Sequence, residues 1–243
     1  MKTSQITIAS AVGFLALIMI VMAGLGRVAL SQSDPSTTQA SSALIVGEQV
    51  VQRFELEGFH GVAIEGAWQV NLTRGDEWQV EVSHSEDLED ELNVHTSGDQ
   101  LVLDVTSSGG WRWWRRTDSR LTAEIVMPEL TEVEMAGASQ LNLSGFEGDL
   151  LVLEIAGANQ LEGRDGRYDN LDLTAAGANE IDLSGVVVTD AQIDVAGASD
   201  VTLRMDGGDL EGSIAGAGGI DYYGTVAEER IKVAGISRVK HLD

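Results

Sequence analysis

Residues 130–159 read LTEVEMAGASQLNLSGFEGDLLVLEIAGAN, and the tripeptide Ala-Gly-Ala occurs twice in them, twenty residues apart. The same small tripeptide recurs toward the end of the chain at intervals of 19 or 20 residues, with Ile236 in place of the last alanine. Such a period is typical of solenoids, in which each repeat buries its apolar face against its neighbours. The central residues, which we expect to be structural turn glycines, are Gly137, Gly157, Gly177, Gly197, Gly216 and Gly235.

Apolar and polar residues alternate on both sides of each tripeptide. Leu153 and Ile155 precede one copy, and Ile181 and Leu183 follow the next. Alternation with a period of two predicts strands with one buried face. No segment between the copies has room for a crossover helix, so we expect two short strands in each coil and parallel ladders between coils. The sequence therefore predicts an all-β, parallel β-helix-like solenoid with coils of about 20 residues.

The tripeptide predicts a tight corner between the two strands of a coil. We expect the glycines to take a positive φ or to let neighbouring coils approach closely, so that only alanine fits beside them. The position after each tripeptide forms a column along the stack. This column is either a polar binding stripe or a set of turn residues that hydrogen-bond from coil to coil, and its small and amide side chains favour the second interpretation. This position is occupied by Ser139, Asn159, Asn179, Ser199, Gly218 and Ser237.

Residues 44–129 lack the tripeptide but keep the alternation. We expect strands over 62–66, 68–72, 78–82 and 101–105, separated by polar turns. Ser85–Leu92, rich in Asp and Glu, predicts a short helix or a lid over the end of the stack, because an uncovered coil exposes strand edges. We therefore expect one domain over 44–243, with less regular coils at 44–129 and regular coils at 130–243.

The N-terminus carries an apolar segment. Ile6–Gly26 is uncharged over 21 residues, a length that can cross a membrane as a helix, although Val21-Met22-Ala23 would also serve as a signal cleavage site. The sequence thus predicts an N-terminal apolar helix within 1–30, either a transmembrane signal anchor or a signal peptide, and a flexible Ser/Thr-rich linker over 31–43. Both alternatives predict an exported domain: anchored in the inner membrane and facing the periplasm, or periplasmic or at the cell surface after cleavage.

Composition excludes several classes of function. With 39 acidic and 15 basic residues the formal charge is −24, which argues against binding to nucleic acid, because phosphate contacts need a cationic surface. The chain has no cysteine, so a thiolate metal site, a cysteine nucleophile and a lipoprotein cysteine are excluded. The four histidines are scattered, and no phosphate loop, dinucleotide fingerprint or nucleophile elbow occurs. We expect no catalytic residues, no metal and no cofactor.

Several motifs together resemble the DUF2807 family, the auto-transporter adhesin head or GIN domains. They are Phe59-x-Gly61-Val62-x-Ile64-x-Gly66, Val70-x-Leu72, Leu101-x-Leu103-x-Val105, the repeated Gly-Ala, and Ile220-x-Tyr222-Tyr223-Gly224. The similarity covers about Val46 to Asp243. It implies a right-handed β-helix-like solenoid on an exported bacterial protein, and it supplies no catalytic residues that could be transferred. The adhesin label rests on likeness of fold, which does not by itself establish function.

One basic and aromatic cluster is the candidate ligand-binding site. Trp111, Arg112, Trp113, Trp114, Arg115 and Arg116 are consecutive and follow Ser107-Ser108-Gly109-Gly110. Indole rings stack on sugars or lie at lipid headgroups, and guanidinium groups bind carboxylate or phosphate. The cluster predicts a loop that binds an anionic glycan, lipid headgroups or a partner protein. The alternative is an aromatic strand whose arginines neutralise neighbouring acidic residues through structural contacts.

Stacking would also bring carboxylates together on the outer surface. Pairs about 5 Å apart suit calcium and match the spacing in a retaining glycosidase, but any two side chains stacked on a parallel ladder have this spacing. We therefore expect a solvated acidic face, with weak divalent-cation binding as the alternative. The expected pairs are Glu134 with Glu154, Glu162 with Asp182, and Glu180 with Asp200.

These features predict a non-enzymatic, adhesin-like module of the cell envelope that binds or scaffolds. Its candidate partners are a glycan or an envelope protein, together with the membrane through an uncleaved N-terminal segment. One alternative is a β-helical carbohydrate-active enzyme, a hydrolase or lyase, on an acidic polysaccharide; such an enzyme needs convergent carboxylates in a groove. Another is a membrane-anchored accessory protein of the envelope stress response.

Overall fold

The structure, a computed structural model, describes residues 42–46, 49–85, 88, 89, 91–105 and 121–243. Residues 42–243 belong to one compact unit. The expected apolar helix and nearly all of the expected linker lie in 1–41, outside the described residues. Within the described part of the chain, no helix has the length and apolarity needed to span a membrane.

Strands make up nearly all of the described chain. Strand β1 begins at Ser42, so the last two residues of the expected linker belong to it. The strands are β1 (Ser42–Val46), β2 (Gln49–Phe54), β3 (Gly61–Gly66), β4 (Trp68–Arg74), β5 (Gln79–Ser85), β6 (Leu92–Ser97), β7 (Gln100–Val105), β8 (Leu121–Met127), β9 (Glu132–Gly137), β10 (Gln140–Ser144), β11 (Glu147–Gly157), β12 (Gln160–Arg164), β13 (Gly166–Gly177), β14 (Glu180–Asp206), β15 (Asp209–Thr225) and β16 (Glu228–His241).

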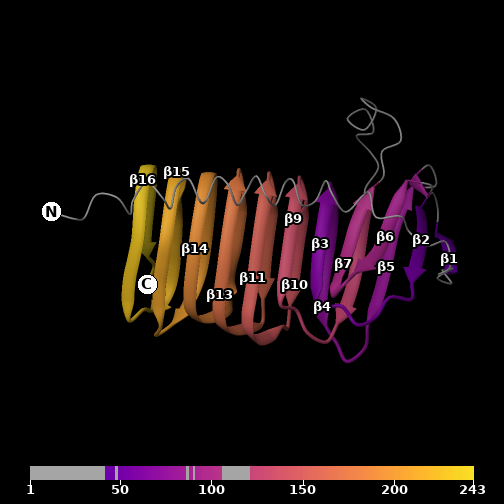
Figure 1. Cartoon of the computed structure of the whole chain (residues 1–243), viewed down its shortest axis with the longest axis horizontal. Helices are drawn as coiled ribbons and strands as arrows, with labels where there is room; N and C mark the ends of the chain where they lie inside the picture. The colour runs from indigo at the N-terminus through magenta and orange to yellow at the C-terminus, as the bar shows by residue number, and fades with distance from the viewer. Residues whose placement is uncertain (1–41, 47–48, 86–87, 90, 106–120) are drawn as a thin grey trace. The chain divides into compact units, whose positions relative to one another are not determined.

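From residue 132 onward the chain is a parallel solenoid with coils of 19 or 20 residues, as the sequence predicts. Gly137 pairs with Gly157, Gly157 with Gly177, and Gly177 with Gly197. The same ladder continues through β15 to β16. The later strands are long because the ladder hydrogen bonds continue around the corners, and Figure 1 shows these coils as a regular row ending at β16.

Residues 44–129 were expected to form less regular coils of the same stack. In the structure their strands do not follow one another along the stack in sequence order. The coil of β3 and β4 lies inside the stack, with β9 and β10 on one side and β7 and β8 on the other. Figure 1 shows the indigo β3 between the pink β9 and the magenta β7. Beyond β7 and β8 the pairing becomes antiparallel: β6 pairs with β7, and β5, β2 and β1 follow β8. Order in space therefore differs from order in the sequence.

These antiparallel strands occupy the end of the stack that was predicted to be covered by a short helix or a lid. The four strands predicted before residue 106 are present as β3, β4, β5 and β7, whereas β1, β2 and β6 were not predicted. In the segment expected to be a helix or lid, Leu88 is buried in the core, and Leu92 already belongs to β6. Residues 86, 87 and 90 lie outside the described part of the chain.

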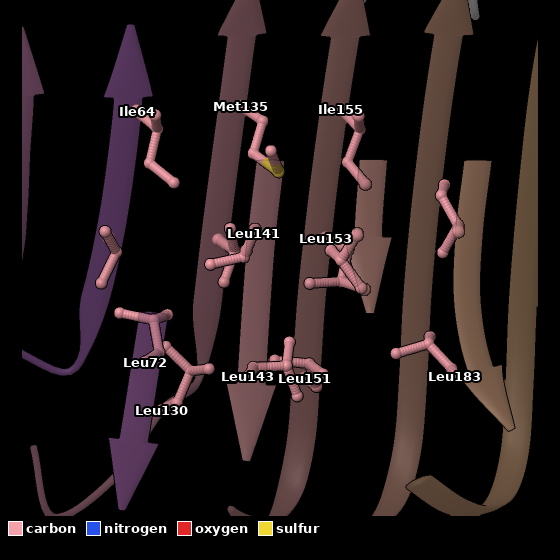
Figure 2. Close-up of a cluster of buried hydrophobic side chains, with 14 of the residues drawn as sticks. Ile64, Leu72, Leu130, Met135, Leu141, Leu143, Leu151, Leu153, Ile155 and Leu183 are labelled. Carbon is pink, nitrogen blue, oxygen red and sulfur yellow. The ribbon is translucent and has the colours of Figure 1, made fainter. Parts of the chain in front are cut away.

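Columns of apolar side chains fill the space between the two strands of each coil. Ile64, Met135 and Ile155 are opposite one another in the register, and each is at most 3% exposed. Figure 2 shows them at one level on neighbouring strands. Burial of such side chains contributes about 1.5–3 kcal/mol each, which makes this continuous core the main source of stability. The outward residues between them form matching columns on the surface.

Candidate functional site: the groove along the corners

The corner glycines form a column of close backbone contacts. Gly157 has a φ of +119°, and a Cβ atom placed on it would lie 2.1 Å from the carbonyl oxygen of Gly137. A residue with a side chain would meet both a left-handed backbone and a clash with the coil below. Both parts of the prediction for these glycines are therefore confirmed. All six predicted turn glycines have a positive φ.

Beneath the corner lies a ladder of buried polar side chains. The backbone N–H of Ser139 donates to Asn159 Oδ1 over 2.9 Å, and that of Asn159 donates to Asn179 Oδ1 over 3.1 Å. The N–H of Asn179 donates to Ser199 Oγ over 3.2 Å. Each amide also donates to a carbonyl of its own corner, as Asn159 does to Ala156 over 3.0 Å. These side chains satisfy the turns from coil to coil, and the prediction of a structural role is confirmed.

Above this ladder runs an open groove of about 840 Å³. It is lined by the exposed last alanine of successive corners, which we call its floor, and by Ser139, Asn159 and Asn179 of the ladder. The floor alanines are Ala138, Ala158, Ala178 and Ala198. Because each alanine lies at the same place in its coil, the floor repeats at each step of about 4.8 Å along the stack. A groove with this translational repeat suits an extended ligand better than a compact one.

Amide side chains form one rim of the groove. Gln69, Gln140 and Gln160 occupy one outward column, in which Glu180 follows. Gln140 Nε2 donates to Gln160 Oε1 over 3.1 Å, and Gln160 Nε2 donates to Glu180 Oε2 over 3.4 Å. Their remaining donors and acceptors face solvent, where they can bind hydroxyl or amide groups. Glu180 was predicted only as a partner of Asp200; the glutamines of this column were not predicted, although Gln140, Gln160 and Glu180 recur at the repeat period.

The predicted cluster Trp111–Arg116 lies in 106–120, outside the described residues. Its chain neighbours are described: Val105 ends β7, and Leu121 begins β8. Leu121 also lines the groove. The segment that carries the cluster therefore rejoins the described chain at a residue of the groove.

Carboxylates gather on the other outer surface, which we call the carboxylate face and define by Glu65, Glu132, Glu134, Glu154 and Asp172. The register places Glu134 beside Glu154, as predicted. Gln100 Nε2 donates to both Glu132 and Glu134, over 2.9 and 2.7 Å. Partial burial, followed by repulsion from Glu134, raises the pKa of Glu154 above its usual value. Burial likewise raises the pKa of Glu65 and of Asp172.

The other predicted carboxylate pairs lie on the surface that carries the groove rim. Glu162 is opposite Asp182 in the register. The backbone N–H of Asp200 donates to the carbonyl of Asn179 over 3.0 Å, which places Asp200 one coil beyond Glu180. Within the described part of the chain, no three His, Cys, Asp or Glu side chains come together as metal ligands. Among the groove residues that the structure describes, only Glu180 is acidic.

This architecture matches that of a known protein family. A family model described as "Putative auto-transporter adhesin, head GIN domain", DUF2807, matches residues 58–225. The chain belongs to the DUF2807 family. The match begins just before β3 and ends with β15, so it covers the groove and both outer faces. No curated protein matches this DUF2807 chain.

Solved structures share the fold of this DUF2807 protein. An adhesin-named protein from Bacteroides fragilis has a TM-score of 0.63 at 13% identity, over 81% of this chain and 98% of its own. Two proteins from Parabacteroides distasonis are more distant likenesses, each covering 81% of this chain and 98% of its own. One is described as an adhesin, with a TM-score of 0.47 and 13% identity. The other is described as a lipid binding protein, with a TM-score of 0.45 and 15% identity.

Proposed function

We propose that this DUF2807 protein is a non-enzymatic, adhesin-like binding module of the cell envelope, and that it binds an extended glycan along the corner groove. The observation that carries the proposal is the groove itself, with its repeating methyl floor and its rim of glutamine amides over several coils. Amide groups recognise hydroxyl groups by paired donors and acceptors, and a flat apolar floor accepts the faces of sugar rings.

The neighbouring segment supports the same proposal. Trp113, Trp114 and Arg115 combine indole rings with a guanidinium group, and this segment leads into Leu121 at the groove. We infer that it provides the stacking and charge contacts that select an anionic glycan. The proposal includes right-handed coils, because connections between parallel strands are almost always right-handed. It also includes export of the domain by the N-terminal segment.

Electrostatics favours binding over hydrolysis. The carboxylates whose pKa is raised, Glu65, Glu154 and Asp172, belong to the carboxylate face and do not line the groove. A glycosidase needs an acid and a base on opposite sides of one bound sugar bond. Glu180, the acidic residue of the groove rim, is instead hydrogen-bonded to a glutamine in its own column.

A glycan array with the full chain, with and without calcium, tests the proposal. We expect anionic polysaccharides to bind, and the triple change W113A, W114A and R115A to reduce binding by tenfold or more, since stacking contributes about 1–3 kcal/mol per ring. Gln140→Ala with Gln160→Ala should weaken binding through the rim, whereas the matched change Gln192→Ala on the other face should have no effect. Cleavage of any bound polysaccharide, or an array on which nothing binds, would contradict the proposal.

A further inference from the structure

The last coil leaves one end of the solenoid open among the described residues. Strand β16 pairs with β15, and no other described strand pairs with it. Ile236 is 89% exposed and Val233 is 48% exposed. The residue opposite Val233 in the preceding coil, Ile214, is 2% exposed. Ile236 continues the outward column of corner alanines, which is exposed along the whole stack. Among the described residues, this end (Figure 1) therefore offers an unpaired strand edge beside Val233, which one more coil would cover.

Strand β16 carries four Lys and Arg side chains against Glu228 and Glu229, a net positive charge in a chain of charge −24. Each of four outward columns ends in a cationic side chain on β16, after coils in which acidic residues recur. One column runs Asp172–Gln192–Glu211–Arg230, and its neighbour runs Thr174–Asp194–Ser213–Lys232. On the other outer face, Asp200–Gly219 ends in Arg238 and Thr202–Asp221 ends in Lys240.

Two of these four cations already have partners. Arg230 forms ion pairs with Asp209, over 2.9 Å, with Glu211 and with Glu228 of its own strand. Arg238 forms ion pairs with Asp221 over 3.0 Å and with Asp200 over 3.8 Å. Lys232 and Lys240 are exposed, and neither forms an ion pair with a described residue. The register of the ladder places the next outward residues of an added strand beside all four cations. An added strand with acidic residues there would continue the alternation of charge along each column.

A second copy of the chain fits this end poorly. Two-fold pairing of β16 with itself about Gly235 would place Arg230 opposite Lys240, and like charges directly opposite are destabilising. Head-to-tail stacking would bring β1 or β6, the edge strands described at the other end, against β16. Neither strand contains an Asp or a Glu. An anionic polymer would meet the cations but would leave the apolar side chains and the backbone edge uncovered.

We propose that β16 is a docking edge for an extended segment of a partner protein, which adds as a further parallel strand with apolar residues inward and acidic residues outward. Main-chain hydrogen bonds to the free edge would hold the segment, Val233 would contact its inward apolar residues, and the four cations would set its register. This inference goes beyond the proposed glycan binding and does not depend on the groove or on residues 106–120.

A peptide with the sequence of residues 169–185, DNLDLTAAGANEIDLSG, is a suitable probe. In its own coil it carries Asp172, Glu180 and Asp182 in three of the four columns. We expect the full chain to bind it, with affinity that falls as salt is raised. Each exposed ion pair contributes about threefold to affinity, so replacing the three carboxylates of the peptide by lysine should weaken binding at least tenfold. Methylation of alternate backbone amides should abolish binding, because it removes strand pairing.

The protein side of the contact is tested by R238E with K240E, the two cations in whose columns the peptide carries Glu180 and Asp182; this change should weaken peptide binding about tenfold. The control, R164E with R204E, makes the same change in net charge on coils away from the end and should bind the peptide as the original chain does. Circular dichroism should show that both variants are folded. Absence of peptide binding, equal binding of the lysine or methylated peptide, or equal weakening in the control variant would each overturn the proposal. Loss of glycan binding with peptide binding retained would refute only the function proposed above.

Discussion

At the scale of single residues, the corner is where a small change has the largest effect. The last alanine of each Ala-Gly-Ala tripeptide is exposed, whereas a Cβ atom on each glycine would meet the carbonyl oxygen of the glycine one coil below. The side-chain ladder under the corner then satisfies backbone N–H groups that would otherwise be buried without partners. The backbone alone therefore restricts which residue can replace each corner glycine.

Gly157→Ala should destabilise the fold by about 3 kcal/mol, since it combines a left-handed backbone with a clash against Gly137. Urea unfolding followed by circular dichroism measures the change. Gly98→Ala is the matched control, because Gly98 also has a positive φ, +64°, but a Cβ there would meet nothing within 4 Å. We expect it to cost only about 1–2 kcal/mol. Equal losses in the two variants would show that the close approach between coils is unimportant.

At the scale of strands and coils, local pattern predicted the regular part and failed at the end. From β9 onward, alternation and the period of 20 fix both the buried face and the partner of each strand. Before residue 130, the alternation in β5 and β7 is the same, yet one pairs antiparallel with β8 and the other parallel with β3. Alternation reports which face is buried but not the direction of the neighbour, so the order of β3 and β4 in the stack could not be predicted.

The candidate site was only partly accessible from the sequence for a similar reason. The turn role of Asn159 follows from its residue type, and the stacking of Glu134 on Glu154 follows from the period. The groove depends on the alanine floor and the glutamine rim facing the same space, which the three-dimensional course of the corner decides. The cluster Trp111–Arg116 stays a prediction.

The carboxylate face gives a pH-dependent prediction for Glu154. Its pKa is raised above 4.5 in the folded chain, so the folded state takes up a proton before the unfolded state does as the pH falls. The contribution of Glu154 to the free energy of unfolding therefore becomes more favourable as the pH drops from its raised pKa in the folded chain toward 4.5. We expect Glu154→Gln to be more stable than the original chain at pH 7.5, by less than about 1 kcal/mol because the site is partly exposed, and to lose this advantage near pH 4.5. Thermal unfolding at the two pH values measures this difference. A constant difference would contradict the raised pKa.

At the scale of the whole molecule, the solenoid is a stack of interchangeable units. Deletion of residues 178–197 removes one period and joins Gly177 to Ala198, which restores a complete tripeptide. We expect a folded protein with a single unfolding transition, lower stability and a solenoid shorter by about 4.8 Å, measured by circular dichroism and small-angle scattering. Deletion of residues 178–187 removes half a period, brings strands from opposite sides of the coil together, and should abolish folding. If both deletion variants fold, or if neither folds, the coils are not interchangeable units of 20 residues.

The buried ladder has a consequence for how such a protein lengthens. Between Asn159 and Asn179 the lower coil presents an N–H and the upper coil an amide oxygen, so a duplicated asparagine coil inserted there finds a donor below and an acceptor above. Past Ser199 the equivalent residue is Gly218, which has no side chain to continue the series. An inserted asparagine coil is therefore accommodated between Asn159 and Asn179, whereas the series of ladder side chains does not pass Gly218.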